Sequence, residues 1–411
     1  MRVLIHGINY FPELTGIGKY TGEMAEWLSE KGASVRVVTA PPYYPEWRIG
    51  SGYSSAKYKF ENIKGIDIWR CPLWIPKHKT GFKRILHLLS FAASSLPILL
   101  KQIFWKPNVI IVIEPAFFCV PISLMVAKLS GAKSWLHIQD FEIDAGFEME
   151  FLSGKVLYRL IKHIEKFIMK SFDCISTISR KMMERLVDNK IPSEKCVLFP
   201  NWVDTEKIFP LPESTFFRRK WGVDDDTMVV LYSGNMGEKQ GLKIIIETAR
   251  KLSDDQNILF VLCGNGAARK RLVRMADGMR NICFLPIQPI DRFNKLLNTA
   301  DIHLLPQSND AEDLVMPSKL TGIFACGGIV IATARKDTEL ANVVLKAGGM
   351  VCTPGDSSKM SKLIKNVSTN RLLHSEKRIS ARNYAISNLA KEKILDNFYN
   401  ELIKILPPND A

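Results

Sequence analysis

Apolar runs of strand length alternate with amphipathic stretches of helix length, and this alternation limits the folds that the chain can adopt. In the first half, predicted strands lie at 3–8, 35–39, 109–113, 134–138 and 174–178, and predicted helices lie at 18–31, at 116–129 and from 179 onward. Repeated strand–helix–strand order is typical of a parallel sheet covered by helices on both faces. We therefore expect an α/β fold.

A proline-rich segment at 199–212 separates this pattern from a second copy of it. Predicted strands follow at 228–233, 258–263, 282–285, 302–306 and 329–333, and predicted helices at 241–252, 267–277, 290–299 and 319–326. The simplest architecture is two Rossmann-like, doubly wound α/β domains facing across a cleft, with ligands at the carboxyl ends of the strands. We expect an N-terminal domain at 1–205 and a C-terminal domain at 206–378. The last segment, 379–411, is expected to contain an amphipathic helix at 379–406. The sequence leaves open whether this segment returns to the first domain.

The chain is basic, with a net charge of +14 that is concentrated at 57–106, where ten basic residues face two acidic ones. Inside this stretch lies a nearly uncharged segment of 16 residues at 85–100, shorter than the roughly 20 residues that span a bilayer. Basic flanks around an apolar segment predict a helix lying in an anionic membrane interface. The predicted membrane contacts are Lys79, Lys83, Arg84 and Lys101. The alternative is a buried crossover helix with a solvated basic loop.

A second basic stretch at 155–185 predicts an amphipathic helix with a cationic side. No zinc finger, RNA-recognition signature or stacking-aromatic motif accompanies it, so we expect no nucleic-acid partner. The eight cysteines form no CxxC pair, which indicates reduced, buried thiols and no structural zinc site. The first residues have no charged segment followed by an apolar one, so we expect no secretory signal.

Two glycine-rich loops between a predicted strand and a helix are candidate phosphate sites. The first contains Gly16 and Gly18, and the second contains Gly234, Asn235 and Lys239. Glycines let the backbone approach an anion with its amide donors, and a lysine near a helix start offsets diphosphate charge. The first loop lacks the GxGxxG spacing of a nicotinamide dehydrogenase, and the second lacks the GK[ST] of a Walker A loop. Purely structural glycine turns and a solvated lysine are the alternatives.

A third candidate phosphate site lies near residue 317. Pro317 and Ser318 indicate a helix start whose amides would face a ligand. We add Lys319 and the strand-end glycine Gly264 to the residues expected to bind a donor.

These segments together resemble glycosyltransferase family 4, whose members have two Rossmann-like domains in the GT-B arrangement. The similarity is greatest to the branch of colanic-acid biosynthesis glycosyltransferases and covers essentially the whole chain. The segments that carry it are 15–22, 40–47, 137–141, 200–204, 233–241 and 314–322.

The resemblance implies that a sugar moves from a nucleoside-diphosphate sugar, held mostly by the second domain, to an acceptor hydroxyl with retention at the anomeric carbon. It implies that Lys239 contacts the diphosphate and that Gly16 sits against the phosphate or the acceptor. Two positions depart from the family pattern. Asn235 stands where members often carry arginine, and Gly322 stands where they carry the glutamate that binds the ribose.

The predicted catalytic residues are Lys239, Asp140, His137 and Asp313. By the resemblance, Asp313 or its neighbour Glu312 takes the place of the family's first glutamate near the transferred sugar. Asp140 and His137 are candidates for acceptor or sugar contacts, and the alternative for His137 is a strand-end histidine bonded to the backbone. No Asp-x-Asp pair follows a strand end, so we expect no metal and no other cofactor. Lys239 and helix-start amides would stabilise the leaving diphosphate.

We therefore expect an enzyme that is cytoplasmic and peripheral on the inner membrane. Its substrates would be a nucleotide sugar and a polyprenyl-diphosphate-linked saccharide of a capsule, O-antigen or colanic-acid-like polysaccharide. One alternative is a sugar-nucleotide epimerase of the same architecture. The other is a membrane-associated scaffold that has lost catalysis, which is motivated by Leu314 and Gly322 at the positions of the family's two glutamates.

Overall fold

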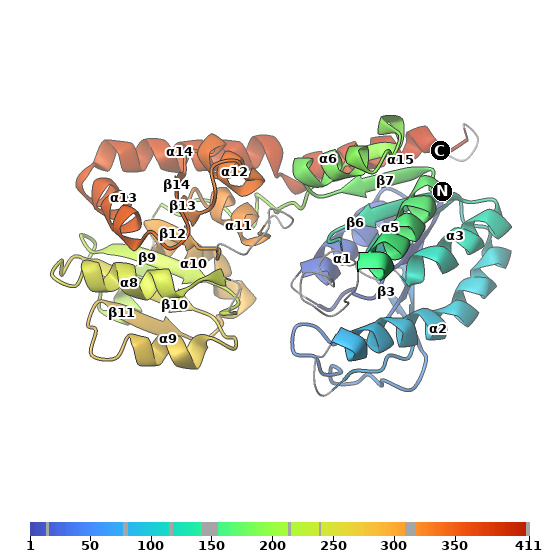
Figure 1. The fold of residues 1–411 in the computed structure, drawn as a ribbon, viewed down its shortest axis with the longest axis horizontal. Helices are drawn as coiled ribbons and strands as arrows, with labels where there is room; N and C mark the ends of the chain where they lie inside the picture. The colour runs from blue at the N-terminus through green and yellow to red at the C-terminus, as the bar shows by residue number, and fades with distance from the viewer. Residues whose placement is uncertain are drawn as a thin grey trace. The chain divides into compact units, whose positions relative to one another are not determined.

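The computed structural model of the protein describes residues 1–13, 16–76, 81–114, 118–141, 155–212, 215–237, 240–308 and 317–407. The chain divides into two compact units (Figure 1). Unit 1 contains Met1–Pro200 and Leu395–Ala411, and unit 2 contains Asn201–Ile394. Each unit is built around its own sheet, so the predicted α/β fold with two sheets is confirmed. The bounds differ from the prediction, since unit 2 begins at Asn201 and continues to Ile394 rather than ending at residue 378.

Unit 1 has an eight-stranded sheet in the order β3-β4-β2-β1-β5-β6-β7-β8. The strands are β1 (Arg2–His6), β2 (Ser34–Thr39), β3 (Lys59–Ile63), β4 (Ile66–Arg70), β5 (Val109–Glu114), β6 (Lys133–Ile138), β7 (Cys174–Thr177) and β8 (Cys196–Leu198). All neighbours are parallel except the hairpin β3–β4 at one edge. The strand order reverses between β1 and β5, and ligands of doubly wound sheets bind at the carboxyl ends beside such a reversal.

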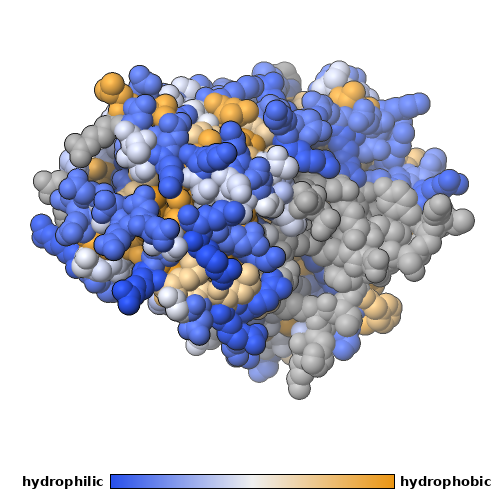
Figure 2. All heavy atoms as spheres, turned by 60° about the vertical axis from the view of Figure 1, so that its left-hand side comes forward, coloured by the Kyte–Doolittle hydropathy of each residue, from blue (hydrophilic) through white to orange (hydrophobic). Residues whose placement is uncertain are grey.

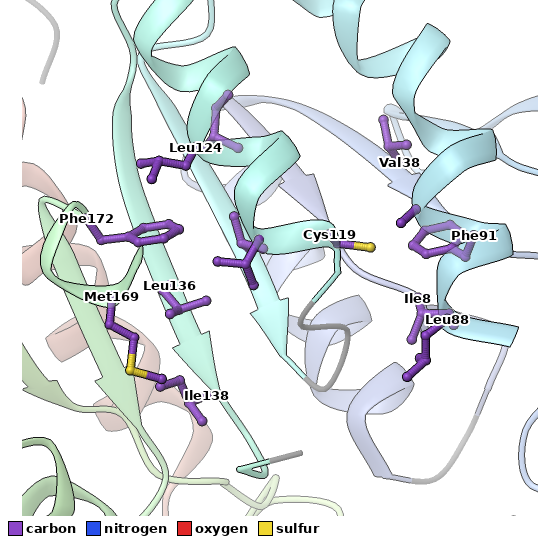
Figure 3. Packing of buried hydrophobic residues seen from close by; sticks show 14 of the residues in the cluster. Ile8, Val38, Leu88, Phe91, Cys119, Leu124, Leu136, Ile138, Met169 and Phe172 are labelled. Carbon is purple, nitrogen blue, oxygen red and sulfur yellow. The ribbon is translucent and has the colours of Figure 1, made fainter. Parts of the chain in front are cut away.

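The helices of unit 1 are α1 (Gly16–Glu30), α2 (Gly81–Trp105), α3 (Cys119–Ser130), α5 (Lys155–Lys170), α6 (Arg180–Asp188) and most of α15 (Lys391–Ile405). One face of the sheet carries a continuous core under α2, α3, α5 and α6. In Figure 3, Phe91 of α2 and Cys119 and Leu124 of α3 lie over this face, where Leu136 points toward them. Its neighbour Trp135 points to the opposite face, because strand side chains alternate, and packs on Phe398 of α15.

Unit 2 has a six-stranded parallel sheet in the order β11-β10-β9-β12-β13-β14. Its strands are β9 (Met228–Ser233), β10 (Ile258–Cys263), β11 (Ile282–Leu285), β12 (Ile302–Leu305), β13 (Ile329–Thr333) and β14 (Met350–Cys352). One face packs on α8 (Lys243–Lys251), α9 (Arg269–Met275) and α13 (Ser357–Thr369). The other packs on α7 (Thr215–Trp221), α10 (Phe293–Thr299), α11 (Lys319–Ala325), α12 (Glu339–Lys346) and α14 (Arg371–Asn388). The strand order reverses between β9 and β12, which brings the loops after these two strands together.

The C-terminal helix differs from its prediction. One helix was expected over 379–406, but α14 ends at Asn388 and α15 begins at Lys391. The break is occupied by Val203, whose N–H donates to the Leu389 carbonyl and whose carbonyl accepts from the Lys391 N–H. A second chain segment thus takes the hydrogen bonds that would continue the helix. The end of the chain from Leu395 then packs in unit 1.

Helix α2 also differs from its prediction. It continues through Pro97 for 25 residues, and it is the described helix that is long and apolar enough to cross a membrane by length and composition. It nevertheless connects β4 to β5 within unit 1, and Phe91 and Leu99 on its inner side are fully buried. The alternative of a buried crossover helix is correct for this side. The outer side leaves Phe82 and Phe104 68% and 88% exposed.

Candidate functional site

A buried carboxylate organises the loop after β1. Glu13, only 5% exposed, accepts hydrogen bonds from Asn9 Nδ2 at 2.9 Å and from the N–H groups of Tyr43 at 3.0 Å and Tyr44 at 2.9 Å. Burial raises the pKa of Glu13, and the hydrogen bonds and the positive charge of Arg70 act in the opposite direction. Glu13 therefore ties the loop after β1 to the loop after β2.

A buried arginine supports the same two loops from β4. Arg70 is 1% exposed and pairs with Glu61 at 2.8 Å. Its guanidinium also donates to the carbonyl oxygens of Phe11 at 2.5 Å and Ala40 at 3.4 Å. The ion pair and these bonds satisfy a charge that would otherwise be costly to bury.

The two glycines predicted to bind ligand in this loop have different roles. A Cβ on Gly18 would lie 2.7 Å from Glu13 Cβ, so this buried glycine makes room for Glu13, and its ligand contact stays a prediction. Gly16 has a φ of +62°, which favours glycine. An ideal Cβ on Gly16 would lie 3.7 Å from the ring of Tyr44, which is partly exposed. Gly16 remains a candidate for ligand contact.

Asp140, directly after β6, belongs to the same edge of the sheet. Burial raises its pKa to about 6, and the positive charge of Arg84 on α2 acts in the opposite direction. The carboxylate in turn helps to raise the pKa of Tyr44, after burial of the phenol itself. Arg84, predicted as a membrane contact, thus faces Asp140. We call Gly16, Tyr44, Arg84 and Asp140 the unit 1 cluster, and its carboxyl can exchange a proton near neutral pH.

His137, in β6, is buried, and its contact with acceptor or sugar stays a prediction. The ring is 3% exposed. Its Nε2 accepts from the Gln139 side-chain amide at 2.9 Å, and its Nδ1 is 2.8 Å from Ser176 Oγ. Burial lowers the pKa of His137 to about 3, so the ring is neutral. Its partners are side chains rather than the backbone that the alternative named.

In unit 2, the loop after β9 packs against the loop after β10. A Cβ on Gly264 would lie 1.9 Å from the Gly234 carbonyl oxygen, and both glycines have positive φ. The Gly234 N–H donates to the Cys263 carbonyl at 2.8 Å, and the Met236 N–H donates to the Asn265 carbonyl at 2.8 Å. Gly264 therefore holds the glycine loop in place. Lys239 lies outside the described residues, so its diphosphate contact stays a prediction.

The start of α11 also reaches this loop. The helix begins at Lys319, directly after Pro317 and Ser318 as predicted, although the Ser318 side chain makes no capping hydrogen bond. Lys319 Nζ is 2.9 Å from Tyr232 Oη, and Tyr232 Oη donates to the Asn235 carbonyl at 2.5 Å. Asp313 precedes this helix outside the described residues.

A pocket of about 450 Å³ opens at the carboxyl ends of β10 and β11. Its lining residues are Gly264, Asn265, Arg269, Pro286 and Ile287. Since Gly264 also packs on Gly234, the pocket adjoins the glycine loop. The cavity therefore lies next to the glycine loop, whose Gly234 and Met236 N–H groups already donate to the loop after β10. Within the described ranges, no three His, Cys, Asp or Glu side chains form a group that could hold a metal ion.

The three lysines predicted to contact a membrane differ in their exposure and in whether the structure describes them. Lys101 is exposed on α2, Lys83 is partly exposed near its start, and Lys79 lies outside the described residues. Glu13, Arg70 and Tyr232 were not predicted at all. No sequence motif identifies these three residues, because each makes hydrogen bonds with residues of another element.

Comparison with known proteins identifies both units. Residues 15–202 match the model of the glycosyl transferase 4-like domain, and residues 213–387 match that of the glycosyl transferases group 1. The putative colanic acid biosynthesis glycosyl transferase WcaI of Escherichia coli K12 is 42% identical over 98% of this chain and 100% of its own length.

Two solved structures share the fold. The Anabaena protein Alr3699/HepE, solved with UDP and glucose, has a TM-score of 0.71 at 13% identity, covering 98% of this chain and 100% of its own. WaaG, a glycosyltransferase involved in lipopolysaccharide biosynthesis, has a TM-score of 0.66 at 18% identity, covering 96% of this chain and 99% of its own. These neighbours have the GT-B fold.

Proposed function

Because the chain belongs to the glycosyltransferases that combine a 4-like domain with a group 1 domain, we propose that it extends a lipid-linked saccharide during synthesis of a bacterial surface polysaccharide. The donor is a nucleoside-diphosphate sugar, and the acceptor is a saccharide on polyprenyl diphosphate. The relative named for colanic acid biosynthesis supports a capsule, O-antigen or colanic-acid-like product.

The observation that carries the proposal is the pocket beside the glycine loop in unit 2. We assign the nucleoside to the cavity lined by Asn265 and Ile287, and the diphosphate to the adjoining glycine loop around Gly234. Both features lie at the carboxyl ends of strands near the reversal of strand order, where doubly wound sheets bind ligands. Lys239 would add a cation to the diphosphate.

We assign the acceptor contacts to the unit 1 cluster. The exposed edge of Tyr44 and the Asp140 carboxyl suit a sugar ring and its hydroxyl groups. In the transfer, the bond from the anomeric carbon to the diphosphate oxygen breaks, and a bond to the acceptor oxygen forms on the same face. The acceptor proton passes to an oxygen of the leaving diphosphate, so no strong protein base is needed. Asp313 would lie near the transferred sugar.

We further propose that unit 1 binds the cytoplasmic surface of the inner membrane through the outer side of α2. Phe82 and Phe104 project from this side, and Lys101 is exposed between them along the helix. Apolar side chains flanked by lysines suit a helix lying in an anionic interface. By contrast, Figure 2, which brings the unit 2 side forward, shows mainly hydrophilic residues with small separate hydrophobic groups.

The test is an assay of the purified full chain with GDP- and UDP-sugars and a synthetic polyprenyl-diphosphate saccharide, with products identified by mass spectrometry. We expect donor consumption only when the acceptor is present, with one sugar added to it. Conversion of a donor alone would favour the epimerase. Absence of nucleotide binding in calorimetry would favour the inactive scaffold.

A further inference from the structure

The side chain of Lys319 lies across the glycine loop of unit 2. An ideal Cβ on Gly234 would be 2.5 Å from Lys319 Cε and 2.8 Å from Nζ, so the loop passes directly beside the ammonium group. Nζ reaches Tyr232 Oη at 2.9 Å and stands 4.2 Å from the centre of that ring. Tyr232 is itself bonded to the Asn235 carbonyl. The ammonium group of Lys319 is therefore fixed beside the glycine loop.

The ammonium group has no carboxylate partner among the described residues. In the described part of the chain, Tyr232 of β9 is the titratable group that faces it, and burial lowers the pKa of Lys319 to about 8. A phenol and an aromatic face compensate a buried charge only in part. An anion bound at the glycine loop would supply the missing compensation.

Resting on the proposed function, we propose that Lys319 binds the diphosphate of the donor and takes up a proton as it does so. An adjacent anion favours the charged form of a lysine and raises its pKa. With a free-state pKa of about 8, roughly half of the lysines are neutral at pH 8 before the nucleotide binds. At that pH, binding should draw about half a proton from the buffer. At pH 6.5 the lysine is already charged, and the uptake due to Lys319 should be close to zero.

Calorimetric titration of the full chain with GDP and with UDP tests this, in buffers of different ionisation enthalpy at pH 8 and pH 6.5. Wild type should show proton uptake at pH 8 with whichever nucleotide binds. Lys319→Met should weaken binding about 10- to 100-fold, as expected for the loss of a hydrogen bond to a charged group, and abolish the pH 8 uptake. Lys319→Arg should also abolish the uptake, because its guanidinium stays protonated, while retaining more affinity than the Met variant.

Lys243→Met is the matched control. It removes the same charge from unit 2, but Lys243 is 67% exposed and pairs with Glu247, so binding and proton uptake should stay at wild-type values. Unchanged affinity in Lys319→Met, or no uptake by wild type at pH 8, would overturn the role of Lys319 and leave the proposed function standing. If wild type binds neither nucleotide, the proposed function itself fails. The wild-type pH comparison requires no variant to fold.

Discussion

Replacing Gly264 by alanine should destabilise unit 2 and disturb the donor site together. The added Cβ would lie 1.9 Å from the Gly234 carbonyl oxygen and 2.9 Å from its carbonyl carbon, and neither backbone atom can rotate away. The φ of +152° adds strain of about 1–3 kcal/mol for a residue with a side chain. Forcing an extra carbon into a packed site adds about 1–3 kcal/mol. We expect a total loss of about 2–6 kcal/mol.

Gly278→Ala is the control for backbone strain alone. Gly278 also lies in unit 2 and has a φ of +76°, but a Cβ there would meet nothing within 4 Å. Its replacement should cost about 1–2 kcal/mol, the penalty for the left-handed conformation. Urea unfolding of both variants gives the difference, and titration with GDP or UDP reports the donor site. A Gly264→Ala variant no less stable than Gly278→Ala, with wild-type nucleotide affinity, would refute the packing argument.

Four further outcomes are expected. Lys239→Ala should lower turnover at saturating donor at least about 100-fold, and full turnover would remove its diphosphate role. The pKa of Asp140 is raised to about 6, so kcat/KM should rise with pH through about 6 if the ionised form acts, and Asp140→Asn should remove that limb. Excess EDTA should leave the rate of sugar transfer unchanged. Loss of transfer in EDTA, with recovery when a divalent ion is added, would contradict metal independence. Changing Phe82 and Phe104 to Asp should reduce cosedimentation with anionic vesicles, while Leu372→Asp, on unit 2 and 79% exposed, should not.

Ten of the fourteen described strands were predicted, because most of these are apolar and buried on both faces, and β3, β4, β8 and β14 were missed. β9 and β10 were predicted to the residue, since each is a run of six mostly buried side chains between polar turns. The edge strand β3 was missed for the opposite reason. Its sequence Lys-Phe-Glu-Asn-Ile is largely exposed and charged, which is how edge strands avoid pairing with other chains. The charged residues of this strand were therefore interpreted as part of a basic loop.

The candidate site was predictable where backbone chemistry marks it and not where distant side chains meet. Glycines after strands pointed to the loops at Gly16 and Gly234, and the structure places Gly16 beside Tyr44 and Gly234 beside Lys319. The same pattern could not separate Gly18, which accommodates Glu13, from a glycine that faces a ligand. Nor does a histidine at a strand end reveal whether its ring points into the core, as His137 does, because that depends on Ser176 from the neighbouring strand.

The packing of α11 gives a physical reason why glycine, rather than the family's glutamate, stands at position 322. A Cβ at this position would lie 3.5 Å from the ring of Phe293 and 3.5 Å from Leu297, both on α10. A glutamate projecting there would meet these apolar groups, and a buried carboxylate without a partner is costly. In this chain a Cβ at position 322 would thus be in van der Waals contact with apolar side chains of α10. We therefore expect the donor to be held mainly through its diphosphate, by the contact proposed for Lys319.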